Sequence, residues 1–337
     1  MPLTKTKVTH SKNKNPSAER LQNLVKIFDK TDRVLIVISA DPDSIASALA
    51  MKRLLWRRVQ SVTIAHNNEI KRLDNLTMVR LLNVPLQRLQ TLATDTFTRK
   101  VMLDSQPYHN PDFAHIDYDA VIDHHPAVEA VKASWVDIRP EYGATASIMF
   151  EYLRAARIKP SVRIATALFH AIKVDTENFT KRATSQDIAA FTRLFDQVNQ
   201  ALIRKIESSD IKLSDLAYFR LALDNMRYSR KRIYCHVGKV EHPDILVLLA
   251  DYFMRVYEIG WGIVSGFCGE KFIVIFRSDG YRKNAGKLAM QVFGAIGSAG
   301  GHRQSARAEI PRTNMPHSGR EFSSRSLERL IVRHLKT

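Results

Sequence analysis

Apolar and polar residues alternate along the chain in blocks that predict a layered α/β protein. The run Val34–Ile38 is wholly apolar, and shorter apolar runs occur at 62–65, 101–103 and 120–122. Strands that are buried on both faces are typical of a parallel sheet wrapped in helices. Apolar residues at helical spacing separate or follow these runs, for example over 145–157. The first half of the chain is therefore predicted to be a parallel sheet with helices on both faces.

The pattern changes after about residue 185. Helical segments continue to about Asn225, and a strand-like run follows at Ile233–Val237. The apolar runs 261–268 and 271–276 flank Gly269-Glu270, a two-residue link that favours a tight hairpin. This half is predicted to be a smaller mixed-sheet α/β domain.

The 337 residues exceed what one hydrophobic core usually serves, so two domains are expected. The composition is 45% hydrophobic and 25% charged, which excludes a wholly disordered chain. We expect a basic flexible arm at 1–17, a first domain at 18–195, a helical linker at 196–230, a second domain at 231–312 and a basic C-terminal helix at 313–337.

The formal charge of +17 is concentrated at the two ends of the chain. Residues 1–20 hold five Lys or Arg against one Glu, and residues 302–337 hold eight against three. The first segment is interpreted as a mobile, solubilising arm, with contact to nucleic acid as the alternative. The second carries one apolar stripe, which predicts a docked terminal helix rather than a partner-binding one.

Only two cysteines, Cys235 and Cys268, argue against a disulfide scaffold. No apolar run approaches the length of a membrane span, and no secretory signal is recognisable. We therefore expect a cytoplasmic protein that does not bind membranes.

Acidic and histidine residues follow four of the predicted elements. Asp41-Pro-Asp43 follows the first strand, Asp104 and Asp123-His124-His125 each follow another, and Asp175 follows a helix ending near Lys173. Loops at the carboxyl ends of parallel strands converge over one crevice, where carboxylates repel unless a cation joins them. The arrangement predicts a site for hard divalent metals, and the imidazole shifts the preference from Mg²⁺ toward Mn²⁺. Each cluster alone is equally compatible with a turn or a helix cap.

At this point the sequence resembles the DHH phosphoesterases, whose name describes the triplet Asp123-His124-His125. It looks most like the bacterial branch that joins a DHH domain to a C-terminal DHH-associated domain and that includes nanoRNase-type and pApA-hydrolysing enzymes and relatives of the RecJ exonuclease. The resemblance spans about residues 30–312. It rests on Asp41-Pro-Asp-Ser-Ile-Ala-Ser47, Leu103-Asp104, Gly143-Ala-Thr-Ala146, Val174-Asp175-Thr176, Phe276-Arg277-Ser278 and Gly300-Gly301-His302.

The resemblance implies up to two Mn²⁺ or Mg²⁺ ions and an active site in the cleft between the domains. Asp43, Asp104, His124 and Asp175 would hold one ion, Asp41 and Asp104 would contribute to a second, and His125 would act beside the phosphate as a catalytic residue. Substrate would be bound in the second domain by Arg277, Ser278, Gly300, Gly301 and His302. Arg277 is otherwise explained as an exposed strand-end charge, and Gly300-Gly301 as a flexible loop.

Two departures from the family pattern stand out. A metal-binding histidine usually lies four residues before the first Asp, but Val37 occupies that position. His109 and His66 are candidate replacements from nearby loops. Arg307 stands where a glycine usually follows the Gly-Gly-His signature, and it is expected to add a charge at the substrate pocket.

The leading hypothesis is a metal-dependent phosphodiesterase that converts short RNA or DNA oligonucleotides, or linear dinucleotides, to nucleoside monophosphates. One alternative is a catalytically impaired nucleotide- or RNA-binding relative whose metal site has decayed at Val37. Another is a hydrolase of inorganic pyrophosphate or a similar small phosphate compound. Homodimerisation is left open.

Overall fold

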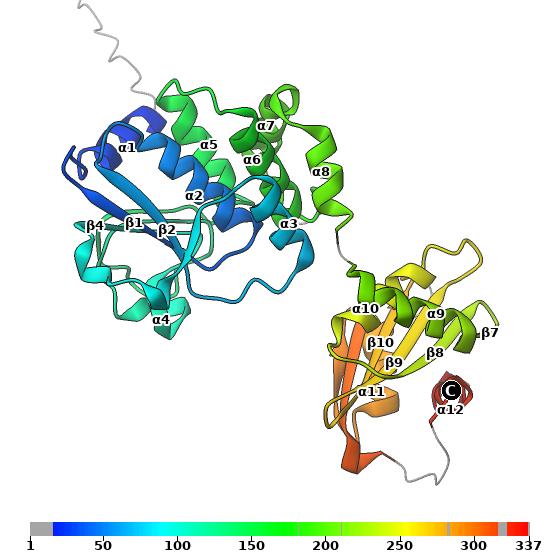
Figure 1. The fold of residues 1–337 in the computed structure, drawn as a ribbon. Coiled ribbons are helices and arrows are strands. Elements are labelled where there is room, and N and C mark those ends of the chain that lie inside the picture. The colour runs from blue at the N-terminus through cyan, green and yellow to red at the C-terminus, as the bar shows by residue number, and fades with distance from the viewer. Residues whose placement is uncertain (1–15, 181, 210, 282–283, 316–321, 336–337) are drawn as a thin grey trace, which may run out of the picture. The chain divides into compact units, whose positions relative to one another are not determined.

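The computed structural model describes residues 16–180, 182–209, 211–281, 284–315 and 322–335. The chain forms two compact units, one ending at residue 210 and the other beginning at residue 211 (Figure 1). That division falls within the segment expected to be a linker. Most of the predicted basic arm, residues 1–15, lies outside the described residues.

A six-stranded sheet forms the centre of the N-terminal unit. The strands run in the order β3-β2-β1-β4-β5-β6, and every neighbouring pair is parallel. They are β1 (Arg33–Ile38), β2 (Ser61–His66), β3 (Leu86–Arg88), β4 (Arg99–Leu103), β5 (Tyr118–Asp123) and β6 (Ala133–Ile138). The predicted parallel sheet is confirmed. The edge strands β3 and β6 are not apparent in the sequence because many of their residues are polar or partly exposed.

Both faces of this sheet are buried, which explains why its central strands are continuously apolar. Ile36 and Ile38 of β1 belong to the larger core, whereas Leu35 and Val37 belong to a smaller core on the other face. All of these side chains are completely buried.

Helices cover both faces of the sheet (Figure 1). Helices α2, α5 and α6 pack against one another over the larger core, while α4 contributes the buried Phe113 to the smaller one. The helices are α1 (Pro16–Val25), α2 (Pro42–Leu54), α3 (Leu73–Leu81), α4 (Pro111–Ala114), α5 (Thr145–Ala155), α6 (Val162–Asp175), α7 (Ser185–Leu194) and α8 (Gln200–Glu207). Helix α2 is buried along almost its whole length, so it lacks the amphipathic pattern of a surface helix.

The C-terminal unit contains a mixed six-stranded sheet in the order β11-β12-β10-β9-β8-β7. Only β8 and β9 are parallel among these described neighbours. The strands are β7 (Arg227–Ser229), β8 (Arg232–Lys239), β9 (Trp261–Cys268), β10 (Lys271–Ser278), β11 (Ser298–Gly301) and β12 (Ser305–Pro311). The predicted hairpin is present: Lys271 pairs with Cys268, and Gly269 has a φ of 55°. This unit confirms the predicted mixed-sheet domain.

Four helices complete the C-terminal unit: α9 (Leu216–Asn225), α10 (Asp244–Phe253), α11 (Ala285–Phe293) and α12 (Ser324–Leu335). Leu327 and Ile331 of α12 are completely buried, and the helix packs on β8 and α11. The terminal helix is therefore docked, as predicted. The expected linker is divided, because α8 packs on α3 and α6 of the first unit while α9 packs on β8 of the second.

No helix within the described ranges is both long and apolar enough to cross a bilayer.

Candidate metal centre

Three neighbouring strands deliver the acidic and histidine residues to one edge of the N-terminal sheet. Asp41 follows β1, Asp104 follows β4, and His124 follows β5. Strands β1, β4 and β5 are adjacent and parallel, so their carboxyl ends lie side by side. The sequence pattern therefore identified residues that the fold brings together.

Asp41 and Asp43 have different roles at the start of α2. Asp41 is the N-cap, and its carboxylate accepts a hydrogen bond of 2.9 Å from the backbone N–H of Ser44. Asp43 is buried, and its carboxylate accepts hydrogen bonds of 2.7 Å from the backbone N–H groups of both Thr145 and Ala146. These two amides open α5, so the positive end of that helix faces Asp43.

Asp104 lies in the left-handed region of backbone conformation, with a φ of 58°. The hydroxyl of Thr145 donates a hydrogen bond of 2.8 Å to Oδ1 of Asp104. Asparagine and aspartate tolerate this backbone conformation better than most residues. The turn and the hydroxyl together orient the buried carboxylate.

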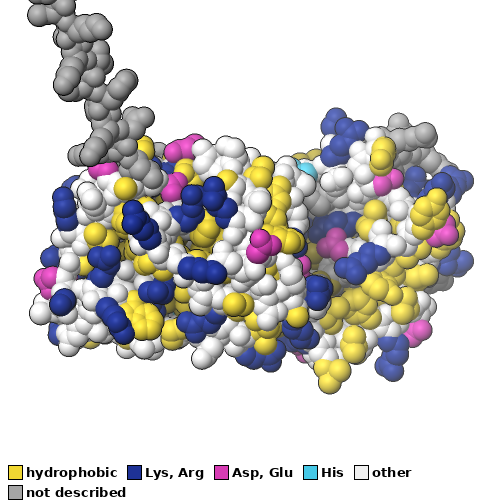
Figure 2. Space-filling view, turned by 90° about the horizontal axis from the view of Figure 1, so that it is seen from above, with side chains coloured by type: hydrophobic (Ala, Val, Ile, Leu, Met, Phe, Trp, Pro, Cys, Tyr) yellow, Lys and Arg dark blue, Asp and Glu magenta, His cyan; other side chains and the backbone are white. Residues whose placement is uncertain are grey.

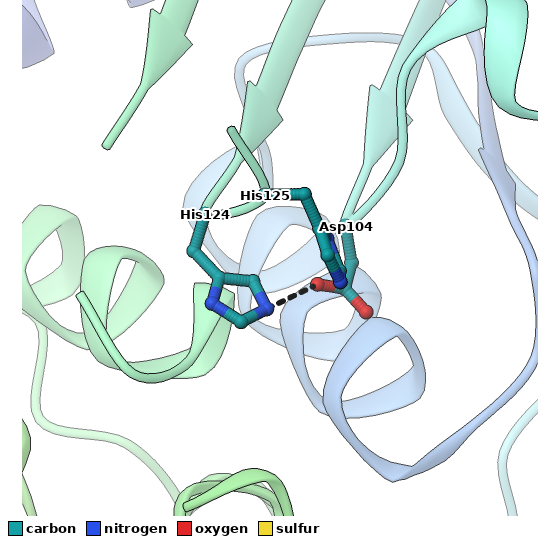
Figure 3. A group of neighbouring side chains, drawn as sticks. All are labelled: Asp104, His124 and His125. Atoms are coloured by element: carbon teal, nitrogen blue, oxygen red, sulfur yellow. Dashed lines mark ion pairs between the residues drawn. The ribbon is translucent and has the colours of Figure 1, made fainter. Parts of the chain in front are cut away.

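His124 is the centre of the cluster. Its Nε2 lies 3.2 Å from Oδ2 of Asp175, 3.6 Å from Oδ1 of Asp104 and 3.9 Å from Oδ2 of Asp43. Figure 3 shows the imidazole of His124 pointing toward Asp104, and the side chain of His125 also lies beside Asp104. Asp175 is the last residue of α6, so the helix predicted to end near Lys173 extends to this candidate ligand.

The hydrogen bonds of His124 leave Nε2 available as a metal ligand. Nδ1 lies 3.2 Å from the carbonyl oxygen of Tyr142, which can only accept, so Nδ1 carries the proton. Nε2 is buried and has no hydrogen-bond partner among the described residues. A lone pair that is buried without a donor, beside three carboxylates, fits a divalent cation.

The electrostatics of the cluster also favour a cation. Burial, together with the charges of neighbouring carboxylates, raises the pKa of Asp43 and of Asp104 well above the usual range. Burial likewise raises the pKa of Asp175 and lowers that of His124. Each of these pKa shifts disfavours the charged form of a buried group that lacks a counter-ion. A bound divalent ion would instead stabilise the carboxylates and the neutral imidazole.

Two compact groups of potential ligands occur in the described residues. One comprises Asp43, His124 and Asp175, and the other comprises Asp104, His124 and His125. Asp41 belongs to neither group, although its charge raises the pKa of both Asp43 and Asp104. The four residues predicted for the first ion are thus divided between two groups that share His124.

His125 is positioned for a different role. Its Nδ1 lies 2.9 Å from Oδ1 of Asp123, and its side chain is 43% exposed. The hydrogen bond to Asp123 raises the pKa of His125. Burial raises the pKa of Asp123, but hydrogen bonds from His125 and Gln106 outweigh that effect and hold it below its usual value. An anionic Asp123 thus favours a protonated His125, in which Nε2 also carries a proton and can donate a hydrogen bond.

Val37 cannot be a ligand. It is completely buried in the smaller core and pairs with Ala65 and Met102 on the flanking strands. His66 and His109, the candidate replacements, belong to neither compact group of ligands. The Nδ1 of His109 accepts a hydrogen bond of 3.2 Å from the backbone N–H of Gln106, so in the neutral ring the proton is on Nε2. His109 in this form is a donor rather than a ligand.

The substrate-binding residues predicted in the second unit are only partly together. Gly300 and Gly301 line a cavity of about 390 Å³ with Asn284 and Lys287, at the start of α11. Arg277 instead donates to Asp251 on α10, with Nε 2.6 Å from Oδ1. Ser278 is buried and donates to the carbonyl oxygen of Arg303.

His302 and Arg307 of this unit also differ in their surroundings. His302 is exposed, and its carbonyl oxygen accepts from the N–H of Gly286. Arg307 lies in the middle of β12, opposite Gly300, and pairs with Glu309 at 2.8 Å. Arg307 does not have a positive φ, so its position does not require the glycine that the family pattern has there.

Sequence reasoning missed the residues that hold the ligands in place. Gln106 is completely buried and donates to Asp123 at 2.7 Å and to the carbonyl oxygen of His125 at 2.9 Å. Thr145 supports both Asp43 and Asp104. A Cβ added at Gly143 would lie 2.6 Å from the carboxylate of Asp187, which explains the glycine there. The motif Gly143-Ala-Thr-Ala146 was visible in the sequence, but its role depends on contacts between distant segments.

Residues 33–172 match the DHH family, N-terminal domain. An uncharacterized protein, MJ1633, from Methanocaldococcus jannaschii is 31% identical over 279 residues, which are 82% of this chain. The chain spans 57% of the length of that relative. An exopolyphosphatase-related protein from Bacteroides fragilis has a similar fold, with a TM-score of 0.60 at 16% identity over 94% of this chain and 96% of that one.

The match to the DHH family domain runs from β1 into α6, so it includes Asp41, Asp43, Asp104 and the triplet Asp123-His124-His125. This match bears out the resemblance seen in that triplet.

Proposed function

We propose that this protein is a Mn²⁺- or Mg²⁺-dependent phosphodiesterase that hydrolyses short oligonucleotides or linear dinucleotides to nucleoside monophosphates. The observation that carries the proposal is the convergence of Asp43, Asp104 and Asp175 on the unpartnered Nε2 of His124. Three carboxylates and an imidazole nitrogen are typical ligands of a divalent ion, and a protein that only binds RNA does not need them.

Asp43, Asp104, His124 and Asp175 would hold one ion, and Asp41 with Asp104 would contribute to a second. Bound divalent ions polarise a phosphoryl oxygen and lower the pKa of a bound water. His125 would supply a proton to the leaving oxygen from Nε2, and Asp123 would keep its ring oriented and charged. Gln106 would keep Asp123 in place.

The second unit would bind the rest of the substrate. The cavity beside Gly300 and Gly301 combines exposed backbone, the start of a helix and the cation of Lys287, which suits a phosphate group. Arg277 would join by exchanging Asp251 for a phosphate, since guanidinium groups bind both bidentately. His302 and Ser278 would border this region.

The substrate panel described below also tests two alternative functions. A catalytically impaired RNA-binding protein would explain Val37, but the other predicted ligands of the first ion are all present and gathered. Hydrolysis of inorganic pyrophosphate or another small phosphate compound needs the same metal centre. The cavity of about 390 Å³ in the second unit offers a further place for part of a larger substrate and so supports the oligonucleotide proposal.

The test is hydrolysis of a panel in Mn²⁺: a linear dinucleotide, a pentanucleotide of RNA, the same of DNA, and pyrophosphate. We expect turnover of the first two, loss of turnover in EDTA, and no turnover by His124→Ala. Turnover of pyrophosphate alone would replace the proposal with the small-substrate alternative. No turnover of any member, with Mn²⁺ bound, would support the impaired relative.

A further inference from the structure

A second charged surface lies at the opposite end of the N-terminal unit from the metal centre. Helix α2 starts beside Asp43 and ends at Leu54, while α6 ends at Asp175 and starts at Val162. The two helices pack together, and the side chains of Lys52 and Arg163 are near enough for Arg163 to lower the pKa of Lys52, after the larger effect of burial. The end of α2 and the start of α6 therefore form one surface.

This surface, here called the basic face, is built from two segments whose charged residues are all positive. Residues 52–61 and 154–163 contain no acidic residue. Its cations are Lys52, Arg53, Arg57, Arg58, Arg154, Arg157, Lys159 and Arg163. Within the described chain, none of these eight forms an ion pair with a carboxylate. Figure 2 shows Lys and Arg side chains spread between apolar ones over the N-terminal unit, with fewer acidic side chains on that view.

An exposed tryptophan lies within the basic face. Trp56 is 58% exposed although tryptophan is usually among the more buried residues. The guanidinium carbons of Arg53 and Arg57 lie 5.2 Å and 5.9 Å from the centre of its ring. Both distances are within the range of a cation–π interaction. The ring is therefore held by cations and still offers much of its surface to solvent.

Arg57 and Arg157 occupy backbone positions that glycine would occupy at lower cost. They have φ values of 61° and 56°, one after each of the helices α2 and α5. A residue with a Cβ costs roughly 1 kcal/mol more than glycine in this region. Arginine at both turns adds to the charge of the basic face at the expense of stability.

Like charges without counter-ions attract a polyanion, and an aromatic ring among them adds a stacking surface for bases. We propose that the basic face is a binding site for single-stranded nucleic acid, in which Trp56 stacks on a base and the surrounding Arg and Lys residues contact phosphates. A duplex keeps its bases stacked inside, so it would gain only the charge contacts.

The basic face is separate from the catalytic centre. The 13 residues of α2 lie between them, a length of about 20 Å. At about 3.4 Å per stacked nucleotide, a strand would need about six nucleotides to cover that distance. A dinucleotide at the metal centre therefore cannot reach Trp56, and the inference does not depend on the proposed hydrolytic function.

The test is fluorescence anisotropy with a 5′-labelled dodecauridylate and the full chain in EDTA, which keeps divalent ions out of the metal centre. We expect Trp56→Ala to weaken binding about tenfold, as loss of one stacked base predicts. Trp56→Phe retains a ring and should stay within about threefold of wild type. Arg57→Gly should weaken binding while raising the melting temperature, because it relieves the backbone cost.

Matched controls come from the other unit. Arg329→Ala removes an exposed arginine of α12, and Tyr257→Ala removes an aromatic side chain that is 98% exposed. Neither should change the affinity for the dodecamer. Wild-type affinity in Trp56→Ala, an equal loss in the two control variants, or equal binding of a duplex of the same length would each overturn the proposal. The last result would assign the basic face to polyanions in general.

Discussion

The hydroxyl of Thr145 donates a hydrogen bond of 2.8 Å to Oδ1 of Asp104. The backbone N–H of Thr145 donates at 2.7 Å to Asp43, so one residue holds two of the candidate metal-binding carboxylates. The three side chains come from the start of α2, the end of β4 and the start of α5. The spacing of the candidate ligands thus depends on a residue that binds no metal itself.

Replacing Thr145 tests this support. Thr145→Val keeps the shape and the backbone N–H but removes the donor to Asp104. We expect the Mn²⁺ concentration for half-maximal activity to rise about 10- to 100-fold, as is usual when a partner of a metal ligand is lost. Thr145→Ser retains the hydroxyl and should behave nearly as wild type. Equal Mn²⁺ dependence in wild type and Thr145→Val would show that the hydroxyl has no such role.

Asp104→Asn is expected to abolish hydrolysis with the fold intact. Asparagine tolerates the φ of 58° at this position, so the loss would report on the carboxylate rather than on the turn. Removing a buried like charge should leave the melting temperature in EDTA at or above that of wild type, while the rise on adding Mn²⁺ should shrink. Calorimetry with and without Mn²⁺ measures both effects. Asp95→Asn, which changes an exposed carboxylate, is the control.

Val37→His introduces, within an apolar core, the histidine that the family pattern has four residues before Asp41. Without metal, a buried imidazole should destabilise the unit by about 1–3 kcal/mol, because its polar atoms lose water. With Mn²⁺ the variant should regain stability and hydrolyse faster than wild type if the native centre lacks a ligand. A melting temperature that is lowered equally with and without Mn²⁺ would mean that the new side chain does not reach the ion.

Substitution of His109 tests whether this residue is a metal ligand or a hydrogen-bond donor. Because Nδ1 already accepts from Gln106, His109→Ala should leave the amount of Mn²⁺ retained after gel filtration unchanged. His124→Ala should lose most of the bound ion in the same measurement by mass spectrometry. Loss of metal from His109→Ala as well would assign His109 as the replacement for Val37.

A buried histidine in the C-terminal unit should make that unit sensitive to acid. Burial lowers the pKa of His236 to about 4, and its ring contacts Ser265 and Phe322. Since the unfolded chain binds a proton near pH 6.5 and the folded one does not, stability should fall as the pH decreases from about 6.5 to 4, by about 3 kcal/mol.

His236→Phe removes this titration and should flatten the pH dependence. Hydrogen exchange of β8 measured between pH 4 and 7 tests the effect where it arises. A pH dependence of β8 protection that is the same in wild type and variant would assign it to other groups.

Sequence alone determined the layered fold and most of the candidate ligands. A central strand such as Val34–Ile38 is apolar on both faces because helices cover both faces, so its pattern reports the architecture directly. Asp41, Asp104 and His124 follow strands whose ends must meet, so their proximity could be inferred from order along the chain. The polar edge strands β3 and β6 gave no such signal.

Only the tertiary structure decided how these residues are held. The hydrogen bonds of Thr145 and Gln106 join segments far apart in the chain, and no local pattern encodes them. The tautomers of His124 and His109 depend on a carbonyl and an amide that folding places beside each ring. The basic face likewise exists because α2 and α6 pack together and bring two unremarkable basic segments to one surface. Sequence determines which groups are present, whereas packing determines which of them are satisfied and which are left free to bind.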